Sequence, residues 1–154
     1  DQDLFEQLGG AYPFDAYSNV LFENPTSESS WIVLRLIGRE ANRFGVGARL
    51  ELVLEAADGS RRSVFAVAGT GGSFGGSSLQ QELGLGDADH IEKVLITWPG
   101  SGTRQEFSDV EPRRFYEVTE GVETLERLVL PRIELRRTGL PAGQHHSHAE
   151  GGAG

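Results

Sequence analysis

Apolar and polar positions alternate along several short stretches of the chain, a period of two that is typical of half-buried β-strands. The clearest stretch is Ile91–Trp98, where Val94, Ile96 and Trp98 share one face and Lys93 lies on the other. The Pro-Gly-Ser-Gly sequence that follows lacks one backbone donor and favours a tight turn. We therefore predict a strand that ends near Trp98 and returns after the turn.

Other stretches show the same or a related pattern. Ala48–Glu55 alternates strictly, and the Asp58-Gly59 pair after it is a hairpin signal. Trp31–Ile37 is apolar at nearly every position, which predicts a central strand covered on both faces. Shorter runs predict the remaining strands, at Asn19–Phe22, Arg61–Ala68, Leu79–Leu83, Thr103–Phe107 and Phe115–Thr119.

The spacing of the turns indicates the fold class. Turn signals recur about every 8 to 15 residues, a rhythm typical of sandwiches and barrels. The 154 residues allow one domain with a sizeable core, and the 21 glycines suit many short strands joined by turns. We predict an all-β domain, an antiparallel β-sandwich or partly open barrel of about seven to nine short strands.

Four segments follow from the pattern. Residues 1–18 are predicted to be an irregular lead-in, and residues 19–121 form the β domain. Residues 122–138 are an extension in which Leu125, Leu128 and Val129 fit one helical face, while the alternation after it favours one or more added strands. Residues 139–154 are rich in Gly, Pro and His, which predicts a tail that is flexible or donated to a neighbour.

Charge and composition exclude some classes of partner. The net charge of -9 repels phosphate backbones, so we expect no nucleic-acid partner. There is no apolar run long enough to insert into a membrane, and no Cys for a disulfide or a thiolate site. The chain starts at Asp1 without an initiator Met or a leader, which we interpret as a processed chain or an excised piece; both fit secretion.

A pair of glycines just before the clearest predicted strand has a predicted structural role. Gly84 and Gly86 bracket Leu85, which predicts a close approach of two backbones followed by an Asx-type turn at Asp87 and Asp89. These residues are expected to be architectural.

Several short motifs follow one another in a distinctive order along the chain. Their residues are Asn42, Arg43, Gly45, Gly47, Ala48, Arg49, Leu83, Gly84, Leu85, Gly86, Trp98, Pro99, Gly102 and Gly121. This order resembles the ASPIC/UnbV module, which forms the C-terminal domain of the cartilage acidic protein and of many bacterial secreted proteins with FG-GAP or VCBS repeats. The resemblance spans about residues 19 to 121. It implies an extracellular β-rich domain, usually attached to a propeller and without established catalytic residues.

A catalytic interpretation has one candidate. Gly71–Gly75 matches the G-x-S-x-G pattern of a nucleophile elbow, with Ser73 as the nucleophile. The elbow needs a helix after the serine, and the Gly-Ser-Ser run that follows Gly75 is a poor helix start. The same loop lacks the lysine of a phosphate-binding loop, since Lys93 is the only lysine of the chain. We therefore expect no enzyme and no cofactor.

Two groups of side chains are candidate metal ligands. His145, His146 and His148 form a cluster of imidazoles that could bind Zn or Cu, if the tail were ordered. Asp87, Asp89 and His90 could hold a cation, although aspartates at turns usually accept bonds from backbone N–H groups.

The aromatic residues and the arginine pairs each have a functional and a structural interpretation. Trp31, Trp98, Tyr12, Tyr17 and Tyr116 could form a platform for sugar rings, but both tryptophans lie in strongly apolar strands, which favours burial in the core. The pairs Arg113-Arg114 and Arg136-Arg137 are expected to be ion-pair partners on an acidic protein.

Our leading hypothesis is a non-catalytic extracellular module that acts through protein contacts, in surface adhesion or as a self-assembling subunit of a filament or matrix. Apolar residues before Asn19 and after Gly121 motivate it, because such ends could add strands to a neighbour or contact an adjoining propeller domain. The alternative is a carbohydrate-binding module of a secreted protein. A hydrolase built on Ser73 is the third hypothesis.

Overall fold

The computed structural model describes residues 3–10, 17–24, 29–71 and 76–131. The regular structure in these ranges consists of strands, and they contain no helix, hence none that could cross a membrane. The strands are β1 (Leu4–Glu6), β2 (Val20–Phe22), β3 (Ser30–Ile37), β4 (Arg49–Ala56), β5 (Arg61–Val67), β6 (Gln80–Gly86), β7 (Ala88–Thr97), β8 (Arg104–Val110), β9 (Arg114–Thr119) and β10 (Glu126–Leu128).

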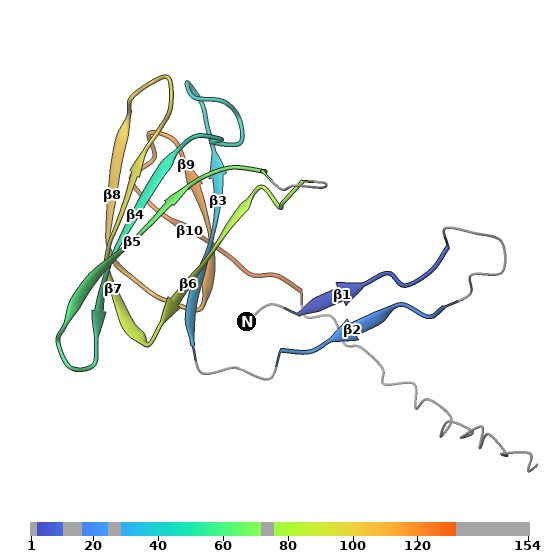
Figure 1. Ribbon diagram of the computed structural model, residues 1–154. Coiled ribbons are helices and arrows are strands. Elements are labelled where there is room, and N and C mark those ends of the chain that lie inside the picture. Colours follow the sequence, from blue (N-terminus) through green and yellow to red (C-terminus); the bar gives the residue numbers. More distant parts are fainter. Residues whose placement is uncertain (1–2, 11–16, 25–28, 72–75, 132–154) are drawn as a thin grey trace, which may run out of the picture.

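Two four-stranded sheets form the body of the molecule, as Figure 1 shows. One has the strand order β10-β9-β3-β6 and the other the order β5-β4-β7-β8. The prediction of an all-β fold is confirmed, and the sheets form a sandwich that is not closed into a barrel. The strands are not all antiparallel, however, because β3 and β9 run parallel, from the pair Ile32 and Arg114 to the pair Ile37 and Thr119.

The core lies between the two sheets, where alternate residues point inward. Its members form one cluster, which includes Leu50, Leu52 and Leu54 of β4 and Val94 and Ile96 of β7. The alternation predicted for these two strands is therefore confirmed. The inward face of β3 completes the centre of the core with Ile32, Leu34 and Leu36.

The predicted turns are also present. Gly59 has a φ of 78° in the β4–β5 hairpin, and its N–H donates to the carbonyl of Ala56 at 2.8 Å. The Pro-Gly-Ser-Gly turn joins β7 to β8, and the N–H of Trp98 donates to the carbonyl of Thr103 at 2.9 Å. Local sequence therefore determines both hairpins, because glycine adopts positive φ without the strain that a side chain adds.

Strand β3 has the predicted central position but not the predicted cover on both faces. It pairs with β9 on one side and β6 on the other. On its outer face Arg35 is exposed, and Trp31 and Ile37 are only half-buried. No further layer of the described chain covers this face of the sheet, although Val33 on it is buried by neighbouring side chains.

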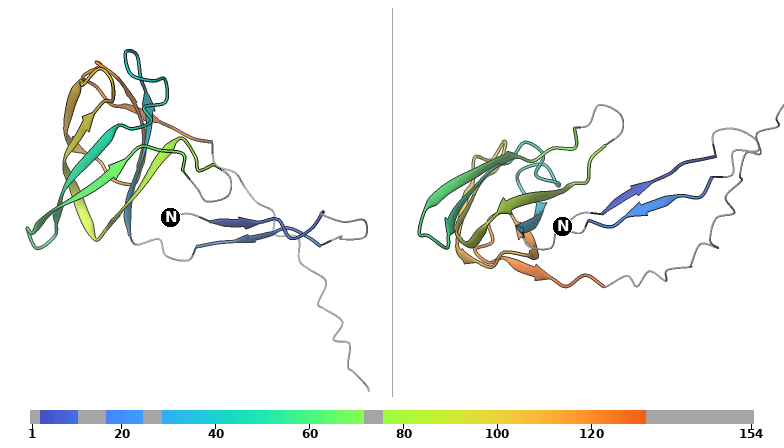
Figure 2. Two further views of the ribbon diagram at one scale, coloured as in Figure 1. Left: turned by 45° about the horizontal axis from the view of Figure 1, so that its top comes forward. Right: turned by 60° about the horizontal axis from the view of Figure 1, so that its bottom comes forward.

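The lead-in is not wholly irregular, which corrects the prediction for residues 1–18. Strand β1 lies within it and pairs antiparallel with β2, with Phe5 opposite Leu21. The two strands form a hairpin that projects away from the sandwich (Figures 1 and 2). The short strand was missed because Gly9 and Gly10 follow it closely and its three residues show no clear alternation.

The extension after Gly121 contains strand β10, which pairs antiparallel with β9. Leu128 lies opposite Phe115 in this ladder. The predicted alternation at Arg132 to Arg137 lies outside the described residues.

Candidate functional site

Most of the motif residues gather at one end of the sandwich, around the loop from Gly38 to Ala48 and the β7–β8 turn (Figure 1). Within the loop, the side chain of Asn42 forms two bonds with the backbone of Val46. Its Nδ2 donates to the carbonyl at 2.7 Å and its Oδ1 accepts from the N–H at 2.8 Å. This asparagine thus holds the loop in shape, which supports an architectural role.

Close packing explains the glycine at position 45. Gly45 has a φ of 62°, and a Cβ there would lie 2.8 Å from the Cβ of Leu36 and 3.1 Å from Cζ3 of Trp98. Trp98 is only 1% exposed. Gly47 also has a positive φ, and the ring of Pro99 lies 3.6 Å from the place of its absent Cβ. Trp98 and Pro99 therefore pack directly onto the glycines of the loop.

The side-chain amide of Gln105 connects Trp98 to the segment from Thr119 to Val122. Its Oε1 accepts from Nε1 of Trp98 at 2.5 Å and from the N–H of Gly121 at 3.1 Å. Its Nε2 donates to the carbonyls of Thr119 and Val122. One amide therefore ties the buried indole to the segment after β9.

The carboxylate of Glu120 was not predicted from the sequence. Glu120 is 3% exposed, and its Oε2 accepts the N–H groups of Arg39, Glu40 and Ala41 at 2.7 to 2.8 Å. Its Oε1 accepts the hydroxyl of Ser101. Burial raises the pKa of Glu120, but these four hydrogen bonds outweigh it and lower the pKa to about 2.

The second motif group, Leu83 to Gly86, lies elsewhere, in strand β6. Leu85 is buried, and Gly86 has a φ of 58° at the turn into β7. The predicted close approach of backbones is wrong for Gly84, because a Cβ there would meet nothing within 4 Å. Asp89 is part of β7 rather than of a turn.

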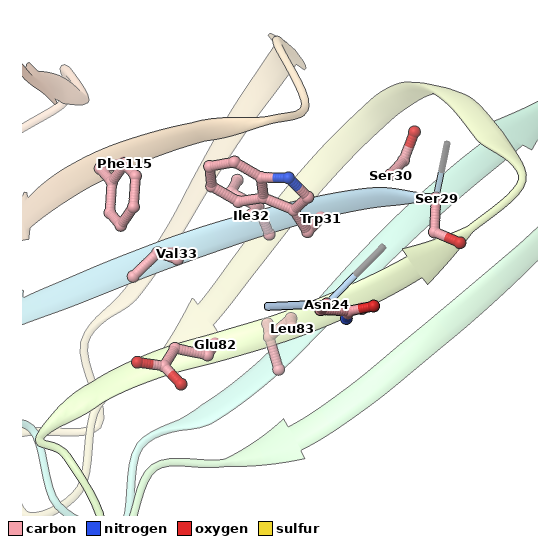
Figure 3. Close-up of a pocket in the computed structure, with 10 residues that line it drawn as sticks. Asn24, Ser29, Ser30, Trp31, Ile32, Val33, Glu82, Leu83 and Phe115 are labelled. Carbon is pink, nitrogen blue, oxygen red and sulfur yellow. The ribbon is translucent and has the colours of Figure 1, made fainter. Parts of the chain in front are cut away.

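The open space above Gly84 belongs to a pocket on the outer face of the β10-β9-β3-β6 sheet. Gly84 pairs with Trp31 across the ladder, so the missing side chain leaves the indole uncovered on that side. Figure 3 shows the pocket, with Trp31 beside Phe115 of β9. The described residues that line it are Asn24, Ser29, Ser30, Trp31, Ile32, Val33, Glu82, Leu83, Gly84 and Phe115.

The two tryptophans therefore differ. Trp98 lies in the core, as predicted, whereas Trp31 is half-buried in the pocket wall, so the prediction of core burial is wrong for Trp31. Of the tyrosines, Tyr116 is buried and donates to the carbonyl of Glu111, and Tyr17 is exposed on the segment before β2. Burial raises the pKa of Tyr116. Tyr12 lies outside the described residues.

Two of the three candidate cation ligands near the β6–β7 turn contact different partners. Asp87 lies 3.9 Å from Arg62, and Nε2 of His90 lies 3.3 Å from Asp109. Among the described residues, no group of three or more His, Asp or Glu side chains could hold a metal ion. Asp87, Asp89 and His90 are thus not brought together as ligands.

Several predicted residues fall outside the ranges that the structure describes. They are Ser73 of the nucleophile pattern, the cluster of His145, His146 and His148, and the Arg136-Arg137 pair. Of the other basic pair, Arg114 donates to Glu111 at 3.2 Å, which agrees with the predicted role in ion pairing.

Comparison with known proteins gives one match. A family model described as ASPIC and UnbV matches residues 38–125, more than half of the chain. The matched span begins at the loop before β4 and ends just before β10, so it includes both groups of motif residues. No curated protein and no solved structure matches the chain.

Proposed function

The chain belongs to the ASPIC and UnbV family, and from this membership we propose that it is a non-catalytic module that works outside the cell through protein contacts. We propose further that copies of the chain associate through the β1–β2 hairpin, as subunits of a surface assembly. The extracellular location rests on the family resemblance.

The observation that carries the proposal is the exposure of apolar side chains on both faces of the hairpin. Leu4 and Phe22 are cross-strand partners on one face, and Phe5 and Leu21 are partners on the other. Leu4 is 63% exposed and Phe5 61%. Polar residues do not alternate with these side chains as they would on a strand with one solvated face.

A two-stranded hairpin is marginally stable in water when nothing packs against it. Covering one face with another part of a molecule would still leave apolar side chains on the other face, so the hairpin is suited to insertion between two surfaces. Among the described strands, β1 and β2 pair only with each other, so the outer edge of each can pair with a further strand. A second hairpin of the same sequence offers the same apolar faces and free edges.

The opposite end of the described chain supports the same conclusion. Val129 and Leu130 follow β10 and are both exposed, at 86% and 52%. Apolar side chains that meet solvent in a contiguous group mark interaction sites on soluble proteins.

The contacts at the end of the sandwich where the motif residues gather support a non-catalytic role. The side chains of Asn42, Gln105 and Glu120 are engaged with backbone groups of neighbouring loops and turns. Their hydrogen bonds stabilise the end of the sandwich and are not directed into the Trp31 pocket, whose described lining contains none of them.

Light scattering on the purified chain over a range of concentrations tests the proposal. The matched variant carries Phe5→Ser and Leu21→Ser, which removes the apolar pair from one face of the hairpin. Because the net charge of -9 opposes association, measurements should be made at about 0.15 M salt, where the Debye length is about 8 Å. We expect oligomers of the wild-type chain and monomers of the variant.

Phe65→Ser is the control, because Phe65 is an equally exposed aromatic residue of the sandwich, 70% exposed on β5. This substitution should leave the mass of the assembly unchanged. A wild-type chain that stays monomeric throughout, or a hairpin variant with the mass of the wild type, would refute the proposal.

A further inference from the structure

We propose that the pocket beside Trp31 binds a neutral sugar ring. This site is separate from the hairpin, and its ligand is a carbohydrate rather than a protein. The pocket has a volume of about 560 Å³, which lies within the range of small-molecule sites, roughly 300–1,000 Å³. Its described lining combines aromatic and aliphatic side chains with several groups that form hydrogen bonds.

The aromatic wall is held in one orientation. The ring centroids of Trp31 and Phe115 lie 5.1 Å apart at an interplanar angle of 64°, an edge-to-face arrangement that stabilises both rings. The backbone on either side is also held, since the N–H of Arg113 donates to the carbonyl of Trp31 at 2.6 Å. A sugar ring presents C–H groups on its faces, which pack against a rigid aromatic surface of this kind.

Gly84 provides the room for a ring. Its cross-strand partner is Trp31, and a side chain at position 84 would stand on the same face of the sheet as the indole. A Cβ would meet nothing within 4 Å there, so no atom of the described residues fills this space. The φ of Gly84 is not positive, so the backbone itself does not require glycine at this position.

The rim also has polar groups. Ser29 contributes an exposed hydroxyl group, and Asn24 and Glu82, which also interact with other parts of the chain, border the pocket with an amide and a carboxylate. Amide and hydroxyl groups both donate and accept, as sugar hydroxyls do. Because the described lining contains no Lys, Arg or His, the pocket favours an uncharged ligand over an anionic one.

The aromatic wall of the pocket offers side chains rather than backbone groups. It stands on β3 and β9, which are paired with each other, and each has another strand on its far side. Their backbone N–H and C=O groups are therefore used within the sheet. The other side of the pocket is lined by the edge strand β6, through Glu82, Leu83 and Gly84. The aromatic wall thus suits a ligand recognised by stacking on its rings.

Titration with uncharged hexasaccharides tests the proposal, using cellohexaose, xylohexaose, laminarihexaose and chitohexaose as the probes. Binding is measured by calorimetry and by tryptophan fluorescence, since Trp98 is buried and Trp31 borders the pocket. We expect saturable binding of at least one probe. Trp31→Ala and Gly84→Val should each weaken its affinity by about tenfold or more.

Phe65→Ala, at an exposed aromatic residue of the other sheet, is the control and should leave the affinity unchanged. If Trp31→Ala unfolds the chain, Gly84→Val still tests the site, because its side chain enters open space. The proposal is overturned if no probe binds at about 10 mM, or if neither pocket variant weakens binding. Tighter binding of a sulfated hexasaccharide than of every neutral one would overturn the ligand class.

Discussion

The side chain of Glu120 joins two separate parts of the structure. Its carboxylate accepts three N–H groups from the loop after β3 and the hydroxyl of Ser101 from the β7–β8 turn. Hydrogen bonds to an ionised group are roughly twice as strong as those between neutral groups. A buried carboxylate with these four partners therefore stabilises the end of the sandwich at which the motif residues gather.

We expect Glu120→Gln to destabilise the chain by about 2–4 kcal/mol, because the amide loses the charge and presents N–H groups to N–H donors. Urea unfolding at neutral pH measures this. The control is Glu117→Gln on the preceding strand β9, which breaks a partly exposed ion pair with Arg35 and should cost at most about 1 kcal/mol. Equal losses for both variants would contradict the role of Glu120.

The low pKa of Glu120 predicts a specific dependence of stability on pH. The folded state lowers the pKa from an ordinary 4.5 to about 2, so the ionised carboxylate stabilises the fold above about pH 4.5. This stabilisation is lost as the pH falls toward about 2. The gap in unfolding free energy between the wild type and Glu120→Gln should thus shrink over this interval, measured by urea titration at each pH. A constant gap would contradict the prediction.

The loop from Gly38 to Ala48 is the element whose shape depends most on glycine. At position 38 the backbone leaves no room for a side chain, since a Cβ on Gly38 would lie 2.2 Å from the carbonyl oxygen of Asn42. At Gly45 positive φ and close packing act together, because the backbone lies against Leu36 and Trp98. A substitution at position 45 therefore meets both backbone strain and a steric clash.

We expect Gly45→Ala to cost about 2–4 kcal/mol, as the sum of left-handed strain and overpacking. Gly59→Ala is the matched variant: Gly59 also has a positive φ, 78°, but nothing lies within 4 Å of the place of its Cβ. Its cost should be about 1–2 kcal/mol, from strain alone. Thermal and urea unfolding of both variants measure the difference, and equal costs would exclude the clash as a cause.

The whole molecule combines a sandwich with a hairpin that adds nothing to its core. The buried cluster begins at Ile32, and every described residue from Leu4 to Phe22 in β1 and β2 is exposed or half-buried. Stability and association are therefore expected to reside in different parts of the chain.

Removal of residues 1–24 should leave the unfolding free energy of the sandwich within about 1 kcal/mol of the wild-type value, because no core contact is lost. The same deletion should abolish the association measured by light scattering. Urea unfolding followed through the emission of buried Trp98 reports on the sandwich. A large loss of stability would show that the hairpin packs onto the sandwich in solution.

The structural role of the motif residues could be predicted from the sequence, but the Trp31 pocket and the buried carboxylate of Glu120 could not. The order of the motif residues indicated the family, and their architectural role at Asn42, Gly45 and Trp98 agrees with the contacts. The pocket was not predicted, since its opening depends on Gly84 lying opposite Trp31 in the ladder. The only signal for Glu120 was a carboxylate directly before Gly121, which surface residues show as well.

The positions of strands β2 to β9, the hairpin turns and the buried faces of β4 and β7 followed from the amino-acid sequence, because they depend on a period of two residues and on local backbone dihedrals. The tertiary structure decided three other features: the parallel pairing of β3 with β9, the hydrogen bonds of Glu120 to the loop after β3, and the partial exposure of Trp31. Each of these features depends on a contact between residues about fifty to eighty positions apart in the sequence. The local alternation of apolar and polar residues does not determine which distant segment becomes the neighbour.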